Sequence, residues 1–334
     1  MKTYNFGILG CGVISKTHAL AISEIENAKL LGVADNNIEY ARVFAQKNGV
    51  KAYESYQEML ADKDIDVVCI CTPSGFHASN AIEALNSGKH VVLEKPMSIS
   101  NEWADKVIEA CERTGKKLTV ISQFRFSEDI KRVKQLIEEN AFGKISLCTL
   151  TMKYYRNPEY YSSSSWRGTL RFDGGGALIN QGIHGVDMLD YIVGPINNVK
   201  GKIATISHNI EGEDTAVAFF QTANGALGVI QGSTCAYPGF DRRIEIHGDK
   251  GYVCLLENKI EKLMVNGEMV DLGELNFTST ANDNTVMDYR MHKAQLENLL
   301  NAIEGKEEIL VDCYEGKKAL AIIQKVYKTS KEEW

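Results

Sequence analysis

The first hundred residues alternate between short apolar runs and helix-forming segments, and the opening run ends in a glycine turn. Residues 4–9 are mostly apolar, Gly10 and Gly12 follow them, and apolar side chains then recur at helical spacing from Ile14 to Ile25. A strand, a glycine turn and a helix in this order are the context in which a G-x-G-x-x-G pattern predicts dinucleotide binding. Ser15 stands in place of the third glycine. Main-chain N–H groups at the start of such a helix bind pyrophosphate. We therefore expect cofactor contacts at Gly10, Gly12, Val13 and Ile14.

A second strand is expected over residues 29–34, and it ends in Asp35. A carboxylate about 20 residues beyond the glycine turn can accept both hydroxyls of the adenosine ribose and repel a 2′-phosphate. No arginine follows until Arg42. The pattern therefore favours NAD over NADP. The alternative interpretation is that Asp35 is a helix N-cap.

The same rhythm continues to about residue 121. Helices are expected over 41–48, 57–61, 78–86 and 101–114, the last capped by Ser100, and strands over 66–71, 90–93 and 117–121. Such alternation predicts a doubly wound parallel sheet, whose ligands bind at the carboxyl ends of the strands. The residues at that edge form the expected cofactor set, which adds Asp35, Thr72, Pro73, His77, Glu94 and Lys95 to the glycine turn.

Lys95 follows the apolar run 90–93 directly, within Glu94-Lys95-Pro96. Burying a lone ammonium costs several kcal/mol, so its charge must reach solvent, a carboxylate or a ligand. Lysine pKa values also shift readily on burial, which suits proton transfer near neutral pH. The alternative is a lysine that only extends its ammonium to solvent at the strand end.

Size and composition limit the function classes. A chain of 334 residues exceeds the usual single-core size, so two domains are expected. The net charge of −7, without a basic block, argues against nucleic-acid binding. No segment has the apolar length of a membrane helix, and the N-terminus lacks a signal-peptide core. The eight cysteines have no zinc spacing, so we expect no metal site and a cytoplasmic location.

Beyond residue 125 the pattern changes to strands. After a helix over 129–139, strand-like runs cover 147–155, 199–207, 216–222, 227–232, 243–247 and 252–256. Turn signals at 224–225, 249–251 and 266–267 mark antiparallel hairpins. The expected fold class is therefore α/β: an N-terminal Rossmann dinucleotide-binding domain, then an α+β domain with a large, open, mostly antiparallel sheet. We expect these domains over 1–122 and 123–312, and a C-terminal helical segment over 313–334 that packs back on the Rossmann domain.

A glycine-rich segment, 173–187, carries the most chemistry in the second half. Asn180, His184 and Asp187 stand at i, i+4 and i+7, which is one face of an α-helix. A histidine on a polar, glycine-introduced helix can present its imidazole to a ligand, with a neighbour fixing its tautomer. The alternative is a structural histidine hydrogen-bonded to Asp187.

Taken together, the N-terminal Gly-x-Gly, Glu94-Lys95-Pro96 and the Gly-Gly-Gly…Gly-x-His-x-x-Asp segment resemble the Gfo/Idh/MocA oxidoreductase family. The resemblance spans essentially the whole chain, including Thr72-Pro73…His77 and Arg125-Phe126. It implies that Lys95 hydrogen-bonds the reacting hydroxyl and that His184 is the general acid/base.

The resemblance also implies a substrate region. Asn180 stands where inositol-dehydrogenase-like members have an aspartate that supports the histidine. An amide can orient a hydroxyl but cannot stabilise an imidazolium by charge. This departure, with Trp166-Arg167-Gly168-Thr169 ahead of it, is more similar to members that act on nucleotide-linked sugars. Tyr154, Arg156, Trp166 and Arg167 are expected to line the sugar pocket, with packing or surface duty as the alternative for each.

The function implied is NAD-dependent oxidation of a ring hydroxyl of a sugar, nucleotide-linked sugar or cyclic polyol. Two alternatives are an NAD-dependent glycosidase that oxidises its substrate transiently and a non-catalytic sensor of NAD or sugar. The presence of both Lys95 and His184 disfavours the sensor. The resemblance further implies a homodimer or homotetramer formed through the C-terminal sheet.

Overall fold

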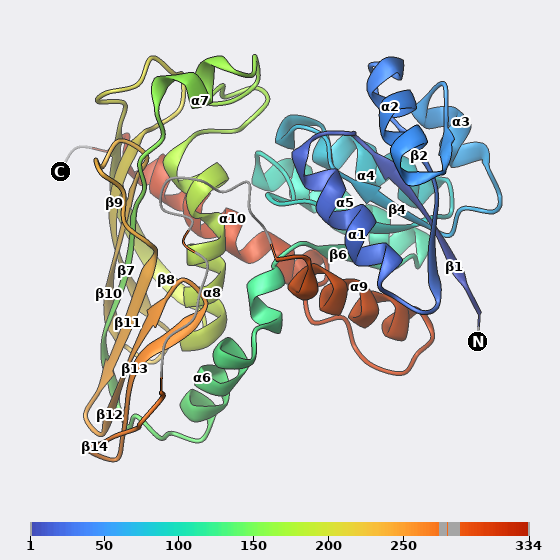
Figure 1. The fold of residues 1–334 in the computed structure, drawn as a ribbon. Helices are drawn as coiled ribbons and strands as arrows, with labels where there is room; N and C mark the ends of the chain where they lie inside the picture. The colour runs from blue at the N-terminus through green and yellow to red at the C-terminus, as the bar shows by residue number, and fades with distance from the viewer. Residues whose placement is uncertain (1, 274–278, 280–287, 333–334) are drawn as a thin grey trace. The chain divides into compact units, whose positions relative to one another are not determined.

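The computed structural model describes residues 2–273, 279 and 288–332, and the chain forms two compact units (Figure 1). Unit 1 comprises Met1–Gln123 and Met287–Lys317, and unit 2 comprises Phe124–Val286 and Lys318–Trp334. The first boundary lies within a residue of the expected one. The later part of the chain divides differently from the expectation, because residues 287–312 belong to unit 1 and most of the last helix belongs to unit 2.

Unit 1 is built around a parallel sheet of six strands in the order β3-β2-β1-β4-β5-β6, as the doubly wound prediction requires. The order reverses at β1, so the loops after β1 and β4 flank the switch point at which ligands bind. Its elements are β1 (Tyr4–Leu9), α1 (Val13–Ser23), β2 (Ala28–Ala34), α2 (Ile38–Asn48), β3 (Lys51–Ala52), α3 (Tyr56–Ala61), β4 (Val67–Ile70), the short 3₁₀ turn η1 (Ser74–Phe76), α4 (His77–Asn86), β5 (His90–Leu93), α5 (Asn101–Thr114), β6 (Leu118–Val120) and α9 (Tyr289–Ile303).

Local capping explains where several of these helices begin and end. The Ser100 hydroxyl accepts a hydrogen bond from the Trp103 N–H at the start of α5, as predicted, and Gly115 ends this helix in the left-handed conformation. Asn37 and Ser55 cap α2 and α3 in the same way. The sequence therefore determines these helix boundaries locally.

The helix α9 joins unit 1 because its apolar face completes that unit's core. Leu296, Leu299 and Leu300 are buried in the same cluster as Phe6 and Ile22. Gln295 of α9 accepts a hydrogen bond from the Ser122 N–H and donates to Thr119 and Val120 of β6. Burial of these side chains is the physical reason for the difference from the expected domain boundary.

Unit 2 contains an eight-stranded sheet in the order β14-β13-β12-β11-β7-β10-β9-β8. Among the described strand pairs of this eight-stranded sheet, only β7–β10 is parallel, so the mostly antiparallel sheet is confirmed. The three turn signals each join two antiparallel strands, but β13 and β14 were not predicted as strands. The elements are η2 (Gln123–Phe126), α6 (Glu128–Glu138), β7 (Ile145–Lys153), α7 (Pro158–Ser162), the π-helix η3 (Ala177–Gly182), α8 (Ile183–Val193), β8 (Ile196–Ala204), β9 (Thr215–Thr222), β10 (Leu227–Ser233), β11 (Arg243–Gly248), β12 (Gly251–Leu256), β13 (Lys259–Val265), β14 (Glu268–Met269) and α10 (Cys313–Thr329).

Helices cover one face of this sheet (Figure 1). Alternate residues of the central strands, such as Leu150, Ile230 and Ile244, are buried, as expected for a sheet with one packed face. From Lys318 onward α10 belongs to this unit, where the Gly201 N–H donates to the Thr329 hydroxyl and the Tyr327 hydroxyl donates to Glu213. From residue 318 onward this helix therefore packs within the sheet domain, and not on the Rossmann domain as expected for the segment 313–334.

Within the described part of the chain, none of the helices combines the length and the apolar character that crossing a membrane requires. All eight cysteines are free thiols, and six of them are buried: Cys69, Cys71, Cys111, Cys148, Cys254 and Cys313.

Candidate active site

The glycine turn of unit 1 is shaped for close approach of a ligand. Gly10 has φ +93°, and a Cβ there would lie 2.7 Å from the Cys71 carbonyl oxygen, so a side chain is excluded. Gly12 is the N-cap of α1, makes no side-chain capping bond and has open space where a Cβ would stand. Val13 is exposed and Ile14 half-buried in the first turn. The helix therefore presents its first N–H groups without a side-chain cap, as a pyrophosphate requires.

Asp35 lies at the end of β2, and its side chain is tied to the glycine turn. One carboxylate oxygen accepts from the Cys11 N–H at 2.8 Å, and the other accepts from the Asn37 N–H. The alternative of Asp35 as the helix N-cap does not hold, because Asn37 is the N-cap of α2. Arg42 is paired with Glu39 and Glu54. This arrangement suits a ribose with free hydroxyls, because a carboxylate stands where a 2′-phosphate would lie and Arg42 is held by two carboxylates.

Thr72, Pro73 and His77 form the turn after β4. The His77 ring is buried, with Nδ1 2.7 Å from the Pro96 carbonyl oxygen and Nε2 2.7 Å from the Thr72 carbonyl oxygen. Burial lowers the pKa of His77, and these two main-chain contacts oppose that effect. Of these three residues, the half-buried Thr72 and Pro73 remain the ones able to face a cofactor directly.

Glu94 and Lys95 follow β5 at the same edge. Lys95 is half-buried, whereas the Glu94 carboxylate is buried and lies 2.8 Å from Nε2 of His18. Burial alone would raise the pKa of Glu94, but the His18 hydrogen bond and neighbouring charges outweigh it and hold that pKa at about 2. Glu94 is therefore an ionised, buried carboxylate beside a candidate catalytic lysine.

In unit 2, His184 is half-buried on the first turn of α8. The Phe124 ring meets its imidazole edge-to-face, with centroids 5.2 Å apart, and the Arg242 guanidinium lies on Phe124. Both oxygens of Asp187 accept hydrogen bonds from Arg125, at 2.7 and 3.0 Å, in a buried ion pair. Asp187 is therefore paired with Arg125, and not with His184 as the alternative interpretation assumed. This buried ion pair anchors α8.

The segment before His184 is a π-helix, so Asn180 and His184 lie on two helix types rather than on one α-helical face. The main-chain N–H groups of Gly176 and Leu178 donate to the buried Glu213 carboxylate, which holds the start of the π-helix. A Cβ at Gly176 would stand 2.1 Å from the Glu213 carbonyl oxygen, which explains this glycine. Single-turn π-helices occur often at functional sites.

Asn180 is part of a polar chain in unit 2. Its amide nitrogen donates to Asp173 at 2.6 Å, and its oxygen accepts from Gln181 at 3.3 Å. Gln181 also donates to the Tyr160 hydroxyl and accepts from Arg156. Asn180 itself is neutral, but its side chain is hydrogen-bonded to a carboxylate, that of Asp173.

Two arginines and several aromatic rings lie along this chain. The buried Arg156 guanidinium is 5.3 Å from the Tyr154 ring centre and 5.8 Å from that of Tyr160. Arg167 is half-buried, donates to the Tyr160 carbonyl and lies over the Tyr160 ring at 4.4 Å. Trp166 is half-buried beside it, at 5.6 Å. Burial raises the pKa of Tyr154 to about 12, so this phenol is neutral.

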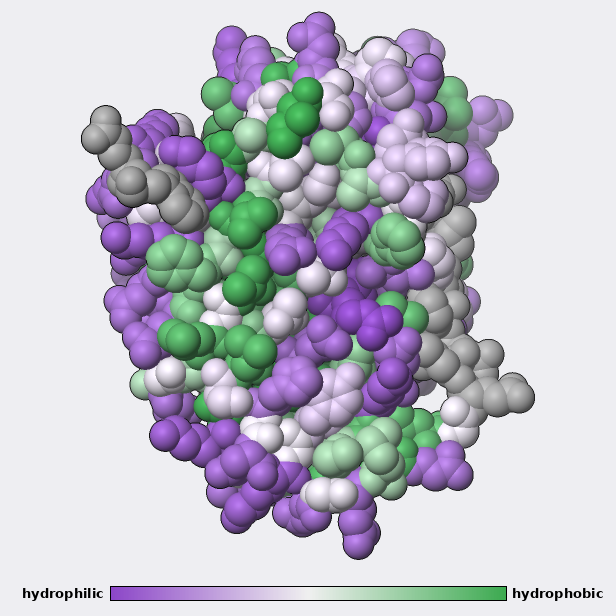
Figure 2. All heavy atoms as spheres, turned by 90° about the vertical axis from the view of Figure 1, so that its left-hand side faces the viewer, coloured by the Kyte–Doolittle hydropathy of each residue, from purple (hydrophilic) through white to green (hydrophobic). Residues whose placement is uncertain are grey.

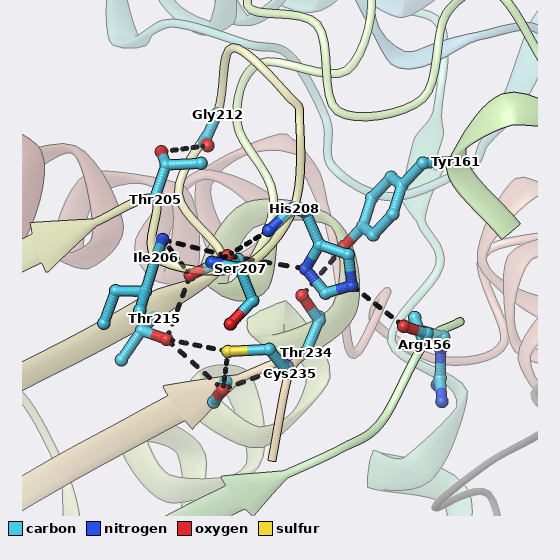
Figure 3. A network of polar contacts seen from close by, with 12 residues as sticks. Arg156, Tyr161, Thr205, Ile206, Ser207, His208, Gly212, Thr215, Thr234 and Cys235 are labelled. Atoms are coloured by element: carbon cyan, nitrogen blue, oxygen red, sulfur yellow. Dashed lines mark hydrogen bonds and ion pairs between the residues drawn. The ribbon is translucent and has the colours of Figure 1, made fainter. Parts of the chain in front are cut away.

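The main chain at Arg156 is fixed by a second network (Figure 3). Nε2 of His208 lies 2.9 Å from the Arg156 carbonyl oxygen. The N–H groups of Ile206, Ser207 and His208 all donate to Asp214. Burial raises the pKa of Asp214, but these donors outweigh it and lower the pKa below its usual range. The loop 205–214 thus supports the segment after β7 that carries Arg156.

Some of these residues were not predicted as site residues. Asp173 and Gln181 both lie in the glycine-rich segment 173–187, and this location is the sequence feature that could have indicated them as site residues. His18, Glu213 and His292 had no local signal, because their partners are far away in the sequence. Among the described residues, His18, Glu94 and His292 form a group whose potential metal-ligand atoms lie within 4.8 Å of one another.

Comparison with known proteins identifies related chains. A family model described as an oxidoreductase family with an NAD-binding Rossmann fold matches residues 4–122, and the GFO/IDH/MocA C-terminal domain matches residues 130–254. Myo-inositol 2-dehydrogenase of Thermotoga maritima is 30% identical over 277 residues, which cover 80% of this chain and 79% of that protein. The uncharacterized oxidoreductase YrbE of Bacillus subtilis is 32% identical over 251 residues, with 73% and 71% covered.

The fold is also similar to solved structures. The WlbA dehydrogenase from Bordetella pertussis, in complex with NADH and UDP-GlcNAcA, has a TM-score of 0.88 at 33% identity. The similarity covers 99% of this chain and 97% of that one.

Proposed function

The chain belongs to the Gfo/Idh/MocA family of oxidoreductases, and on this premise we propose that it oxidises a ring hydroxyl of a sugar or sugar derivative with NAD. The observation that carries the proposal is the pairing of an uncapped glycine turn and a ribose-type carboxylate, Asp35, with Lys95 at the same sheet edge. When bound, NAD supplies the acceptor for the hydride that leaves the carbon bearing the hydroxyl.

We propose separate roles for Lys95 and His184 in this reaction. Lys95 hydrogen-bonds the hydroxyl oxygen and stabilises negative charge as it develops there. His184 takes the hydroxyl proton as general base, so that loss of one proton and one hydride leaves a carbonyl. Phe124, edge-on to the imidazole, supports the orientation of His184.

The substrate region is proposed to lie along the chain of Asn180, Gln181 and Arg156, with Tyr154, Trp166 and Arg167 beside it. A planar guanidinium suits a carboxylate or phosphate through two parallel hydrogen bonds. Together with the UDP-GlcNAcA bound by the WlbA dehydrogenase, this supports an anionic, nucleotide-linked sugar ahead of a neutral polyol.

The test is Lys95→Met, which keeps most of the side-chain volume and removes the ammonium. We expect turnover to fall by roughly two orders of magnitude or more, with NADH affinity within a few-fold of wild type. Lys89→Met is the matched control, because the Lys89 ammonium donates to the Asp62 and Ile65 carbonyls and has a structural role. It should change stability and leave turnover intact. Normal turnover in Lys95→Met would reject the proposed role.

Substrate class is tested by following NADH formation against UDP-sugar acids, free sugars and cyclic polyols. Preference for a polyol would contradict the proposed anionic substrate. Release of product from a chromogenic glycoside without net NADH would identify the glycosidase reaction instead.

We also propose that the uncovered face of the sheet in unit 2 forms a homo-oligomer interface. Leu147, Val217, Phe219 and Leu227 are between 46% and 60% exposed there, on the adjacent strands β7, β9 and β10. Figure 2 shows hydrophobic side chains gathered on this side of the molecule. Exposed apolar patches of this kind mark interaction surfaces.

The experiment is Phe219→Glu, measured by sedimentation velocity. Each of two associating copies would have to bury one added carboxylate in the interface, which opposes association. A dimeric or tetrameric wild type should therefore become monomeric in this variant. Lys47→Glu, at an exposed position of α2 in unit 1, is the control for added negative charge. A wild type that is already monomeric would refute the interface. The free thiols support the further proposal that the enzyme works in the reducing cytoplasm.

A further inference from the structure

Three nearly inaccessible side chains meet behind Lys95 in unit 1. His18 comes from α1, Glu94 from the end of β5 and His292 from α9, with exposures of 0%, 5% and 0%. Nε2 of His18 lies 2.8 Å from one oxygen of Glu94, and Nε2 of His292 lies 3.9 Å from the same oxygen. The two imidazole rings meet edge-to-face, with centroids 5.4 Å apart.

The second oxygen of Glu94 accepts a hydrogen bond from the main-chain N–H of Lys95 at 3.1 Å. The N–H of Glu94 itself donates to the Ile70 carbonyl of β4. One buried carboxylate thus links α1 to the main chain of Lys95. A buried carboxylate needs such partners, because an unpaired one is strongly unfavourable.

The main chain is also held on the other side of Lys95, where the Pro96 carbonyl meets the His77 ring at 2.7 Å. Buried groups therefore fix the backbone both before and after the lysine. The side chain of Lys95 starts from a well-determined position, which is what a group acting on a single reacting oxygen requires.

We propose that Glu94, oriented by His18 and enclosed by His292, is a positioning residue that fixes the main chain of Lys95 for hydride transfer. This inference rests on the proposed function, because it assigns Glu94 an effect only through Lys95. A displacement of about 1 Å at a reacting group can lower a rate by roughly 10²-fold.

The first variant is Glu94→Gln, which keeps the shape and removes the charge. The amide oxygen of the new side chain can accept from the Lys95 N–H, while its NH₂ group donates to Nε2 of His18. The ring proton of His18 can then sit on Nδ1, which has no hydrogen-bond partner within the described part of the chain. We expect the melting temperature to stay within a few degrees. We expect kcat to fall by roughly 30-fold or more, with Kd for NADH within about 3-fold and a larger primary deuterium isotope effect.

The second variant, His18→Gln, keeps the proposal testable where Glu94→Gln does not fold. It should lower kcat similarly, and the double variant should lower it no further, because both changes release the same contact. His90→Leu is the matched control. It removes a histidine that accepts from the Lys117 N–H at the opposite end of β5, so it should affect stability and leave kcat within about 2-fold.

The outcomes are separable from those of the proposed function. Normal turnover in Lys95→Met refutes the proposed function. An inactive Lys95→Met with an unchanged kcat and isotope effect in both Glu94→Gln and His18→Gln refutes this inference alone. A stoichiometric divalent cation in the purified protein, lost in His292→Leu, would also overturn it, because an ion would then hold Glu94.

Discussion

His292 makes the stability of unit 1 depend on pH in a way that can be isolated. The ring is completely buried, and its Nε2 has no hydrogen-bond partner among the described residues. Burial lowers the pKa of His292 from 6.5 to about 4. The folded state therefore favours the neutral ring, and the unfolded chain binds a proton that the folded chain does not.

The sign and size follow from linkage. Because the folded pKa is the lower one, the contribution to stability is full above pH 6.5 and is lost as the pH falls toward 4. Between pH 8 and pH 5 the loss is about 2 kcal/mol, and it approaches about 3 kcal/mol at still lower pH. In His292→Leu this loss disappears, whereas Glu94, with a pKa of about 2, stays ionised at pH 5.

The assay is urea unfolding of wild type and His292→Leu at pH 8, 7, 6 and 5, followed by circular dichroism. At pH 8 the two should agree within about 1.5 kcal/mol, since leucine is close in volume and removes unsatisfied polar atoms. At pH 5 the variant should have gained about 2 kcal/mol relative to wild type. Leu296→Val, a buried change on the same helix, should give a difference that is constant with pH. A constant difference for His292→Leu as well would refute the reasoning.

Three further changes have defined outcomes. Asp187→Asn should lower the free energy of unfolding by about 3–5 kcal/mol in urea titrations, because it removes the carboxylate charge from a buried ion pair with Arg125; Arg125→Met added to it should recover part of the loss, and no recovery would contradict this. Asp35→Ser should weaken NAD binding by roughly 10-fold or more and narrow its preference over NADP, as measured by fluorescence titration; unchanged affinity would exclude the ribose contact. Gly10→Ala should abolish measurable NADH binding, since its Cβ would meet the Cys71 carbonyl; near-normal binding would show that the turn can relax.

The parts of the fold that depend on short-range chemistry were predictable from the sequence. The cap at Ser100 and the hairpin turn at 224–225 each follow from residues within one turn. The features that depend on distant partners were not. The π-helix forms where Glu213 binds the N–H groups of Gly176 and Leu178, 37 and 35 residues earlier, and no local pattern announces that contact.

The same distinction holds for the candidate site. The spacing of Asn180, His184 and Asp187 predicted that all three lie on one face of an α-helix. In the structure Asp187 instead pairs with Arg125, 62 residues away, and Asn180 donates a hydrogen bond to Asp173. Residue types and motifs indicate the chemistry, whereas side-chain pairing depends on which elements the fold brings together.

The membership of α9 in unit 1 has a consequence for how the chain is made. Leucines of α9 complete a core whose other members are all synthesised by Ile121, about 170 residues earlier. At translation rates of about 5–20 residues per second, a nascent Rossmann sheet therefore exists for roughly 10–30 s with part of its apolar surface uncovered. During that interval we expect chaperones to bind the uncovered apolar surface on the ribosome. For the same reason, we expect a fragment that ends near residue 123 to aggregate, because it lacks the leucines of α9.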